Sequence, residues 1–259
     1  MNDSSHSQPP LAPEPVWALL LALRQIRRQW ETFPDRLGLG FDRHGQAVVA
    51  PVADSAAWIE VTADSGWIAS VPISAAGAEL LDLYLPMALA CRTRPLTLAH
   101  LGQSLDGRIA TLEGVSRTLN GPENLTHLHR LRALCDAIIV GAGTVECDNP
   151  QLTTRRVSGV NPVRVIVDPR RRLAADHQVF QDQAAPTWVI CAKELAAVDA
   201  PGHTRVIGVA YHHQRLDLTA VVRSLHDCGL FGIFVEGGGL TVSSFLEAGL
   251  LDRLQIAIA

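Results

Sequence analysis

Apolar and polar positions follow two different patterns along the chain, and the first covers residues 16–92. Apolar residues recur there at helical spacing, with arginines between them, at Leu19, Leu20, Leu23, Ile26 and Trp30. The next stretches, GLGFDRHGQAVVAPV and AAWIEVTADSGWIASVPI, favour short strands separated by RHG and DSG turns. A second helix, AGAELLDLYLPMALA, is expected to end near Arg92. The pattern predicts a small α+β unit.

No recognisable site lies in this unit. Its role stays open between a lid, a dimerisation unit and a module that docks a partner. Residues 1–15, which precede it, are dominated by Ser, Pro and Gln. They offer little to bury, so we expect a disordered tail.

From Pro95 onward, strands alternate with helices. The short apolar runs are LTLAHL, DAIIVGAG, VRVIVD, TWVICA, RVIGVA, FGIFVEGGG and DRLQIAIA. Such runs suit a sheet that is covered on both faces. The helical stretches between them are GPENLTHLHRLRALC, LTAVVRSLHDCG and LTVSSFLEAGL. Residues 95–259 therefore predict an α/β domain with helices on both faces of its sheet.

Composition narrows the class of protein. A chain of 259 residues, 47% hydrophobic and 19% charged, can bury a sizeable core. Its net charge of −4 favours no nucleic-acid partner. The run VWALLLAL is too short to cross a bilayer, and the chain does not start like a signal peptide. The five cysteines are an odd number without CxxC spacing, which favours reduced thiols over disulfides or zinc. We expect a cytoplasmic protein with no membrane partner and no metal.

Two glycine turns follow predicted strands, where ligands of open α/β sheets bind. VGAGTVECDNP fails as a GxGxxG dinucleotide loop, because Glu146 stands in the place of the third glycine and no helix pattern follows. VEGGGLTVSSF is better suited to phosphate, since its glycines let an anion approach the start of a helix near Leu240. Taken alone, however, a GGG turn more often serves only as a tight connection between a strand and the following helix.

Other candidate residues have ordinary explanations. SLDGRIA and the Asp148-Asn149-Pro150 stretch are typical turn formers. Arg132, on a leucine-striped helix, is expected to extend to solvent or to pair with Asp136. None of these signals is strong singly.

In combination and in order, these segments resemble the reductase domain of bacterial bifunctional riboflavin-biosynthesis deaminase-reductases. The resemblance covers residues 95–259 and is carried by LAHLGQSLDGRIA, LRALCDAIIVGAGTVECDNPQLTTR, NPVRVIVDPRRRL and IFVEGGGLTVSSF. It implies a dihydrofolate-reductase-like fold, a three-layer sandwich, and a homodimer. The implied reaction is NADPH-dependent reduction of a phosphorylated ribosylaminopyrimidine, 5-amino-6-(5-phosphoribosylamino)uracil, or of a related pyrimidine or pterin, by hydride transfer to the sugar C1′.

The resemblance also gives roles to residues. The substrate-binding set that it implies is Ser116, Arg132, Leu152, Arg155 and Glu236, with the arginines and Ser116 around the ribose phosphate. The implied cofactor-binding set is Gly102, Gln103, Thr118, Thr144, Asp148, Gly238, Gly239, Leu240 and Thr241. Thr144 and Asp148 would lie between cofactor and substrate. Asp148 is the candidate catalytic residue, orienting or protonating groups near the reacting carbon.

Some positions depart from the family's pattern. His100 replaces the usual lysine, Gln103 an alanine, and Thr118 a tryptophan that helps to enclose the pocket. No zinc motif of the deaminase half is found, and the reductase-like domain is expected to be short at its C-terminus. These departures leave one alternative open, a non-catalytic relative that binds a ligand or a partner through the same pocket.

Overall fold

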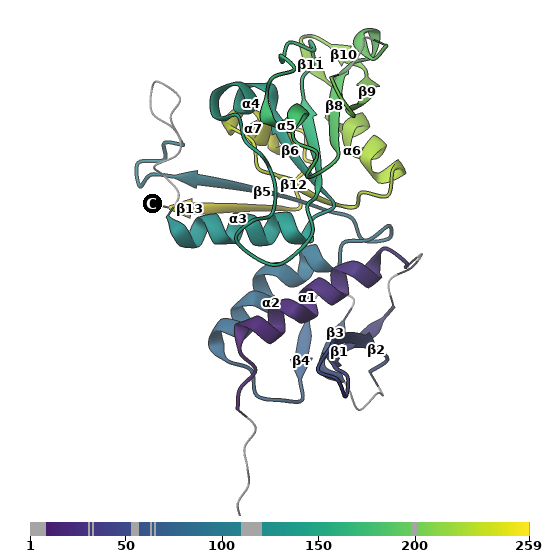
Figure 1. Cartoon of the computed structure of the whole chain (residues 1–259), viewed down its shortest axis with the longest axis vertical. Coiled ribbons are helices and arrows are strands. Elements are labelled where there is room, and N and C mark those ends of the chain that lie inside the picture. The colour runs from purple at the N-terminus through teal and green to yellow at the C-terminus, as the bar shows by residue number, and fades with distance from the viewer. Residues whose placement is uncertain are drawn as a thin grey trace, which may run out of the picture. The chain divides into compact units, whose positions relative to one another are not determined.

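The computed structural model describes residues 9–30, 32, 34–52, 57–62, 64, 66–109, 121–197 and 201–258 (Figure 1). The chain divides into two compact units, Met1–Arg94 and Pro95–Ala259. Each unit is built around its own sheet.

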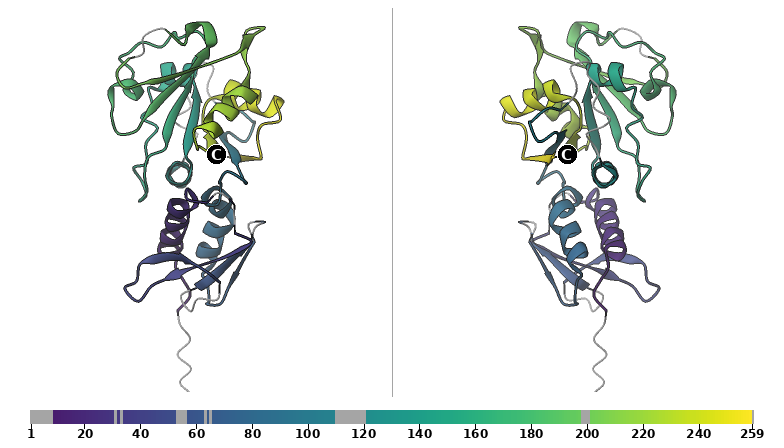
Figure 2. Two further views of the ribbon diagram at one scale, coloured as in Figure 1. Left: turned by 90° about the vertical axis from the view of Figure 1, so that its right-hand side faces the viewer. Right: turned by 90° about the vertical axis from the view of Figure 1, so that its left-hand side faces the viewer.

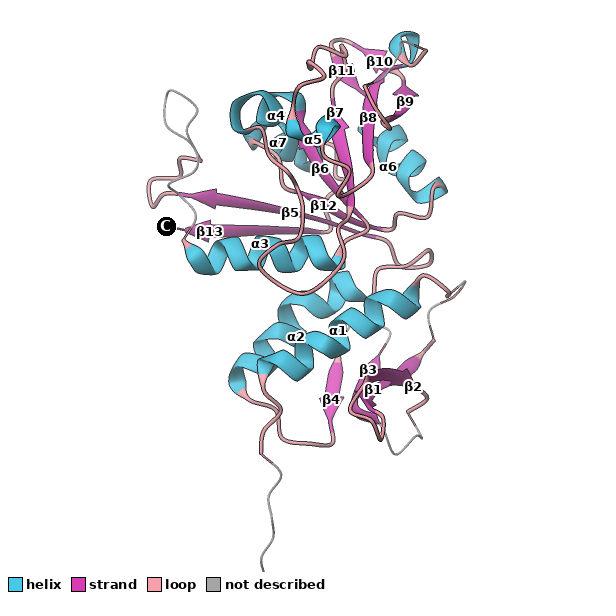
Figure 3. Cartoon of the chain, in the orientation of Figure 1, coloured by secondary structure: helices cyan, strands magenta, loops and turns pink. Residues whose placement is uncertain are grey.

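The first unit contains two helices and an antiparallel sheet (Figure 3). The helices are α1 (Pro13–Arg27) and α2 (Ala75–Ala88). The strands, in the sheet order β2-β1-β3-β4, are β1 (Arg36–Phe41), β2 (Ala47–Ala50), β3 (Ala57–Thr62) and β4 (Trp67–Ala69). The predicted helices and strands are thus confirmed.

The start of the first unit differs from the sequence prediction. Helix α1 begins at Pro13, where proline is favoured in a first turn, and Leu11 forms a bridge with Ile73. The disorder expected for residues 1–15 is therefore wrong from Leu11 onward. The apolar face of α1, which includes the fully buried Leu19 and Leu23, packs against α2.

The second unit is a seven-stranded sheet in which every pair of neighbouring strands is parallel. In sheet order its strands are β13 (Arg253–Ile258), β5 (Leu96–Gln103), β12 (Gly232–Val235), β6 (Ala137–Gly141), β7 (Val163–Val167), β8 (Thr187–Ala192) and β9 (Arg205–Val209). The α-helices are α3 (Pro122–Leu134), α4 (Ala142–Asp148), α5 (Gln178–Gln181), α6 (Leu218–Asp227) and α7 (Gly239–Glu247). A 3-10 turn, η2 (Lys193–Leu195), and a hairpin of β10 (Tyr211–His212) and β11 (Arg215–Leu216) complete it. The predicted α/β class is confirmed.

The two faces of this sheet carry different helices. Helices α6 and α7 lie together on one side, where Val221, Val242 and Phe245 join a buried cluster with Ala99 of β5 (Figure 2). Because side chains alternate along a strand, His100 of β5 points to the opposite face. There its ring contacts His127 of α3.

Two details of the helices follow from local chemistry. Helix α6 is followed by Gly229 at φ +79°, the left-handed conformation that commonly ends helices. Helix α4 directly follows Gly141, where no helix was predicted. That prediction was wrong because α4 has only seven residues and buries only Ala142 and Val145, too short a pattern to detect.

The parallel arrangement positions the site. Strands β6, β7 and β12 all end at one edge of the sheet, so the residues that follow them, among them Thr144, Asp168 and Glu236, are brought together. None of the helices in the described part of the chain is long and apolar enough to span a membrane.

Candidate active site

Two cavities open at this edge of the parallel sheet. The larger has a volume of about 1250 Å³ and the smaller about 180 Å³. Four residues line both of them: Ile109, Thr144, Asp148 and Gly238. The cavities therefore adjoin, and these residues form their common wall.

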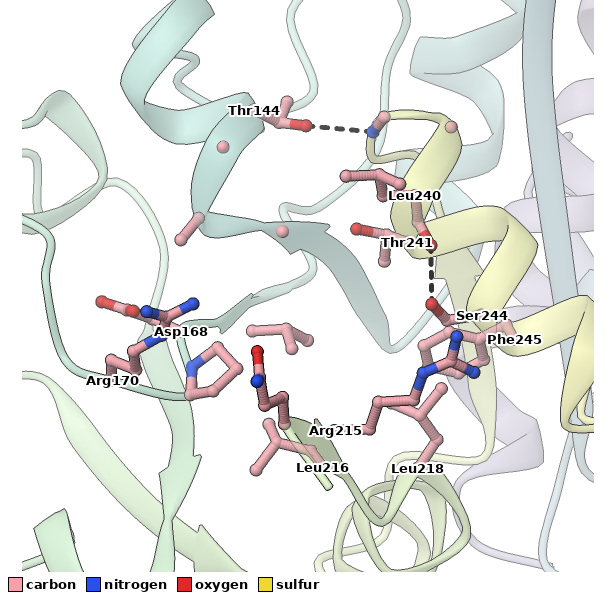
Figure 4. A pocket seen from close by; sticks show the side chains of 18 of the residues that line it. Thr144, Asp168, Arg170, Arg215, Leu216, Leu218, Leu240, Thr241, Ser244 and Phe245 are labelled. Carbon is pink, nitrogen blue, oxygen red and sulfur yellow. Dashed lines mark hydrogen bonds between the residues drawn. The ribbon is translucent and has the colours of Figure 1, made fainter. Parts of the chain in front are cut away.

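The glycine turn and the first turns of α7 form one wall of the larger cavity. Figure 4 shows Thr144 facing this turn, with Thr241 and Ser244 along α7 and with Asp168 and Arg170 elsewhere on the cavity wall. The Thr144 Oγ1 accepts a hydrogen bond of 3.0 Å from the Gly238 N–H. This bond ties α4 to the start of α7, where unpaired N–H groups and the helix dipole favour anions.

Close backbone contact explains why the first residue of this turn, Gly237, is a glycine. A Cβ at Gly237 would come within 2.7 Å of the Val140 Cα and 3.0 Å of the Gly141 nitrogen. A Cβ at Gly239 would meet the Ile109 side chain at 2.5 Å. Glycine is therefore needed for packing at Gly237, independently of any ligand.

The larger cavity is lined by charged groups of both signs, which are three arginines and the acids Asp148, Asp168, Asp217 and Glu247. Arg170, Arg172 and Arg215 line it. Arg172 pairs with Glu146 at 2.7 Å, and Arg215 pairs with Glu247 at 3.0 Å. Both pairs are partly or largely exposed to solvent.

Asp168 has an unsatisfied oxygen in the same cavity. It is 2% exposed, and its Oδ2 accepts a 3.0 Å hydrogen bond from the Leu173 N–H. Its buried Oδ1 has no partner among the described residues. A buried carboxylate oxygen without a donor is costly, which indicates a place for a ligand hydroxyl or a water molecule.

The smaller cavity is closed by the segment that follows α4. Asp148, Pro150 and Leu152 line it. Asn149 and Leu152 have φ values of +41° and +55°, a conformation that is uncommon for residues with side chains. The segment holds Leu152 against the cavity at the expense of local strain.

Arg132 of α3 and Glu236, which follows β12, form an ion pair beside the smaller cavity. The Arg132 Nε donates to Glu236 Oε2 at 2.7 Å and the NH2 group donates to Oε1. The NH1 group donates to the Thr153 carbonyl at 3.1 Å. Burial opposes the charge of Arg132, but Glu236 outweighs that effect and raises the pKa of the guanidinium.

Neither expectation for Arg132, an extension to solvent or a pairing with Asp136, is confirmed, because Arg132 is 7% exposed and is bonded to Glu236. Asp136 instead accepts hydrogen bonds from the Phe231 and Gly232 N–H groups through its Oδ2. It fixes the start of β12, which leaves Arg132 for the distant Glu236. The reason is tertiary, because Asp136 lies just before β6 and faces the neighbouring strand.

Arg155 lies next to this pair on a more exposed surface. Its backbone N–H donates to His129 Nδ1 at 2.9 Å, and its NH1 group donates to Thr153 Oγ1 at 2.6 Å. Burial and then the charges of Arg132 and Arg155 lower the pKa of His129 to about 4. His129 is therefore neutral near pH 7 and can accept the bond from Arg155.

The residues singled out from the sequence fall into three groups. Those that line a cavity are Gly102, Thr144, Asp148, Leu152, Glu236, Gly238, Gly239, Leu240 and Thr241. Gly102 lies in the smaller cavity and not in the larger one. Gln103, Arg132 and Arg155 line neither cavity, and Ser116 and Thr118 lie outside the described residues.

Other residues of the site were missed in the sequence. The larger cavity is also lined by Ile109, Asp168, Arg170, Arg172 and Arg215. Asp168 directly follows the strand VRVIV, so the rule that ligands bind after parallel strands was a usable signal. Arg215 offered none, since a short hairpin far along the chain brings it to the cavity.

Sequence comparison decides the family. The model of the RibD C-terminal domain matches residues 95–259, which is the whole of the second unit. The chain belongs to the RibD C-terminal domain family. The resemblance noted from the motifs is thereby confirmed.

Relatives of this RibD C-terminal domain include proteins that are named only as reductases and proteins that are named as both deaminase and reductase. The 2,5-diamino-6-ribosylamino-4(3H)-pyrimidinone 5′-phosphate reductase of Methanothermobacter thermautotrophicus is 39% identical over 171 residues, which cover 64% of this chain and 78% of that protein. The structure of riboflavin biosynthesis reductase Rib7 of Saccharomyces cerevisiae superposes with a TM-score of 0.53 at 25% identity, covering 63% of this chain and 72% of that one.

A bifunctional relative has the same fold in part of its length. The Thermotoga maritima diaminohydroxyphosphoribosylaminopyrimidine deaminase/5-amino-6-(5-phosphoribosylamino)uracil reductase superposes with a TM-score of 0.53 at 28% identity. The match covers 69% of this chain and only 50% of that protein. The dihydrofolate-reductase-like fold expected for this RibD C-terminal domain is confirmed.

Proposed function

We propose that this protein is an NADPH-dependent reductase of a phosphorylated ribosylaminopyrimidine in riboflavin biosynthesis. The observation that carries the proposal is the common wall of the two cavities, formed by Ile109, Thr144, Asp148 and Gly238. Hydride transfer requires two ligands whose reacting carbons are in contact, and adjoining cavities at one sheet edge provide such an arrangement. The 39% identical reductase of Methanothermobacter thermautotrophicus supports this activity.

The larger cavity suits the cofactor. Its volume of about 1250 Å³ exceeds the ~300–1,000 Å³ usual for ligand pockets, as a long dinucleotide requires. The glycine turn and the first N–H groups of α7 would bind the pyrophosphate, and Asp168 Oδ1 would accept from a ribose hydroxyl. Arg170 and Arg172 would favour the additional phosphate of NADPH over NADH. When bound, the cofactor supplies the hydride.

The smaller cavity would hold the sugar of the substrate. The Glu236 carboxylate lines this cavity and is held by Arg132. Since Arg132 is committed to Glu236 and to Thr153, we assign the substrate phosphate first to Arg155 and Ser116. Arg132 then acts mainly by orienting Glu236.

The reaction needs one proton in addition to the hydride. The bond between C1′ and the ring oxygen of the sugar breaks, the oxygen gains a proton, and C1′ gains the hydride. Asp148 belongs to the wall common to both cavities, so we assign to it the orientation or protonation of groups at the reacting carbon. Leu152 and Ile109 would exclude water there.

Oxidation of NADPH tests the function. The purified protein is incubated with NADPH and, in turn, with 2,5-diamino-6-ribosylamino-4(3H)-pyrimidinone 5′-phosphate, the corresponding aminouracil phosphate and several pterins. We expect oxidation with one of the ribosylamino phosphates. NADPH binding without oxidation in any mixture would instead support the non-catalytic alternative.

We also infer a cytoplasmic homodimer. All five cysteines are free, as in a reducing compartment. β13 is the last strand in the sheet order, and in the described single chain its residues Leu254, Ile256 and Ile258 are between 38% and 63% exposed. An exposed edge strand is suited to pairing with a strand of a second copy of the chain. Light scattering after gel filtration should give twice the 27.9 kDa of one chain, and a mass of one chain would refute the dimer.

A further inference from the structure

Arg164 of β7 is a buried arginine that lines neither cavity but is bonded to the segment that closes the smaller one. It is 1% exposed. Its NH1 group donates to the Gln151 carbonyl at 3.3 Å and to Asp182 Oδ2 at 3.3 Å. Its NH2 group donates to the carbonyls of Asp182 and Ala185 at 2.7 Å and 2.6 Å. One guanidinium thus ties Gln151 to the main chain of residues 182–185.

The carbonyls of the residues before and after Leu152 are both held by buried arginines. Arg164 binds the carbonyl of Gln151, and the Arg132 NH1 group donates to the carbonyl of Thr153 at 3.1 Å. Leu152 itself has a φ of +55°, is 2% exposed and lines the smaller cavity. A leucine in this conformation is strained and persists only where its surroundings hold it.

The bond from Arg164 acts on the peptide group that sets the conformation of Leu152. The angle φ is the rotation about the N–Cα bond of Leu152, and the peptide group between Gln151 and Leu152 lies at one end of that bond. A hydrogen bond to the Gln151 carbonyl therefore opposes the rotation that would release the strain. Without it, Leu152 is expected to turn and to change the wall of the smaller cavity.

Other bonds hold the two ends of this segment. The Asn149 Oδ1 accepts from the Gln178 N–H at 2.8 Å, and the Thr154 N–H donates to Asn161 Oδ1 at 2.7 Å. Loss of Arg164 is therefore expected to change the wall locally rather than to release the whole segment.

Stability alone does not explain a charge at this position. Burial lowers the pKa of the Arg164 guanidinium, and the charge of Asp182 acts in the opposite direction. Buried ion pairs are often no more stabilising than apolar residues of similar volume. The planar guanidinium is better explained by the main-chain geometry that it fixes, since its two NH2 groups reach carbonyls of two separate segments.

We propose that Arg164 is a positioning residue of the substrate site, which holds Leu152 in its left-handed conformation against the smaller cavity. The proposal rests on the proposed function and deepens it, because it assigns the shape of the sugar site to a residue behind the cavity wall. Arg164 also lies outside the site set expected from the sequence.

Arg164→Met tests this role, because it keeps a long side chain and removes every donor. We expect kcat/KM for 2,5-diamino-6-ribosylamino-4(3H)-pyrimidinone 5′-phosphate to fall by about tenfold or more, since a misplacement of about 1 Å can cost up to ~100-fold. The Kd for NADPH should not change, because Leu152 does not line the larger cavity. Hydrogen exchange at the amides of residues 151–154 should become faster.

A double-substitution cycle shows whether Arg164 acts through Leu152. Leu152→Ala removes the side chain that Arg164 is proposed to place. In a chain that already carries Leu152→Ala, Arg164→Met should lower kcat/KM further by less than about threefold. A double variant whose loss equals the product of the two single losses would overturn the proposal.

Arg27→Met is the matched control. Arg27 of α1 is also 1% exposed and also donates to a main-chain carbonyl, that of Met87, but it belongs to the first unit. Its replacement should leave kcat/KM unchanged even where the melting temperature falls. If Arg164→Met does not fold, Arg164→Lys keeps the charge but cannot span both segments, and the same loss of kcat/KM is expected.

Calorimetric binding of the same phosphate, without turnover, keeps the two proposals apart. Wild type that binds it but oxidises no NADPH would refute the proposed reductase, yet a weaker Kd in Arg164→Met would still support the role of Arg164. Equal values of Kd and of kcat/KM in wild type and Arg164→Met would overturn that role, as would wild type that binds none of the phosphate.

Discussion

Arg132 Nε donates to Glu236 Oε2 at 2.7 Å, and the two side chains are only 9% and 15% exposed. The pair joins α3 to the end of β12, across 104 residues of chain. It places the Glu236 carboxylate at the smaller cavity, and the bond from Arg132 fixes the orientation of that carboxylate. Both the stability of the unit and the geometry of the site depend on this contact.

Glu236→Gln tests the pair. The substitution leaves the buried Arg132 guanidinium without a counter-charge, and breaking a buried pair commonly costs about 3–5 kcal/mol. We expect the free energy of unfolding, measured in urea, to fall by about 3 kcal/mol. In the exposed pair of Arg215 with Glu247, the change Glu247→Gln should cost less than about 1 kcal/mol. Equal losses in the two variants would contradict the account.

Gly237→Ala tests the contact between the glycine turn and β6. The new Cβ would meet the Val140 Cα at 2.7 Å, and neither backbone can move without disturbing the sheet. We expect a loss of about 1–3 kcal/mol, the usual cost of overpacking, in thermal or urea unfolding. Gly143→Ala in α4 is the control, since nothing lies within 4 Å of its added Cβ. Gly143→Ala should be neutral or slightly stabilising, so comparable losses would argue against the close contact.

Asp148→Asn tests the residue at the common wall. If Asp148 orients or protonates groups at the reacting carbon, kcat should fall by about 100-fold or more while the Kd for NADPH changes little. Asp227→Asn, at the end of α6 and outside both cavities, is the control for the loss of one carboxylate in the same unit. Near-normal turnover and substrate affinity in Asp148→Asn would remove this residue from the mechanism.

The buried histidines predict how stability depends on pH. In the folded protein, burial first, then neighbouring positive or histidine groups, lower the pKa of His100 and of His129 to about 4, against 6.5 for an ordinary histidine. Between these values the unfolded chain binds protons that the folded chain does not. Stability should therefore be complete above about pH 6.5 and decline toward pH 4, by up to ~1.4 kcal/mol per pH unit for each histidine.

Urea unfolding at a series of pH values measures this decline. His100→Gln removes one of these groups and should make the dependence shallower over the same pH range. The same slope in wild type and His100→Gln would show that His100 is not held neutral in the folded protein.

The sequence predicts the sheet well because each of its strands is a short apolar run. Strands such as β6 and β12 are buried on both faces, so the run itself carries the information. Helix α4 lacked such a signal, with only two buried residues. The motifs placed Asp148 and the glycine turn in one site, but Asp168 and Arg215 reach the larger cavity through tertiary structure.

The partner of Arg132 could not be predicted from helix spacing. Asp136 was the nearest acid, yet its carboxylate is used by the Phe231 and Gly232 N–H groups. The contact between the His100 and His127 rings is likewise invisible in the sequence, because it depends on α3 lying beside β5.

Isotope transfer tests the central claim most directly. The protein is mixed with NADPH that is deuterated at the transferable C4 position and with 2,5-diamino-6-ribosylamino-4(3H)-pyrimidinone 5′-phosphate. The account predicts a ribitylamino product that contains the deuterium at C1′, with one NADPH consumed for each product formed. Bound NADPH and bound substrate with no deuterium in any product would contradict it.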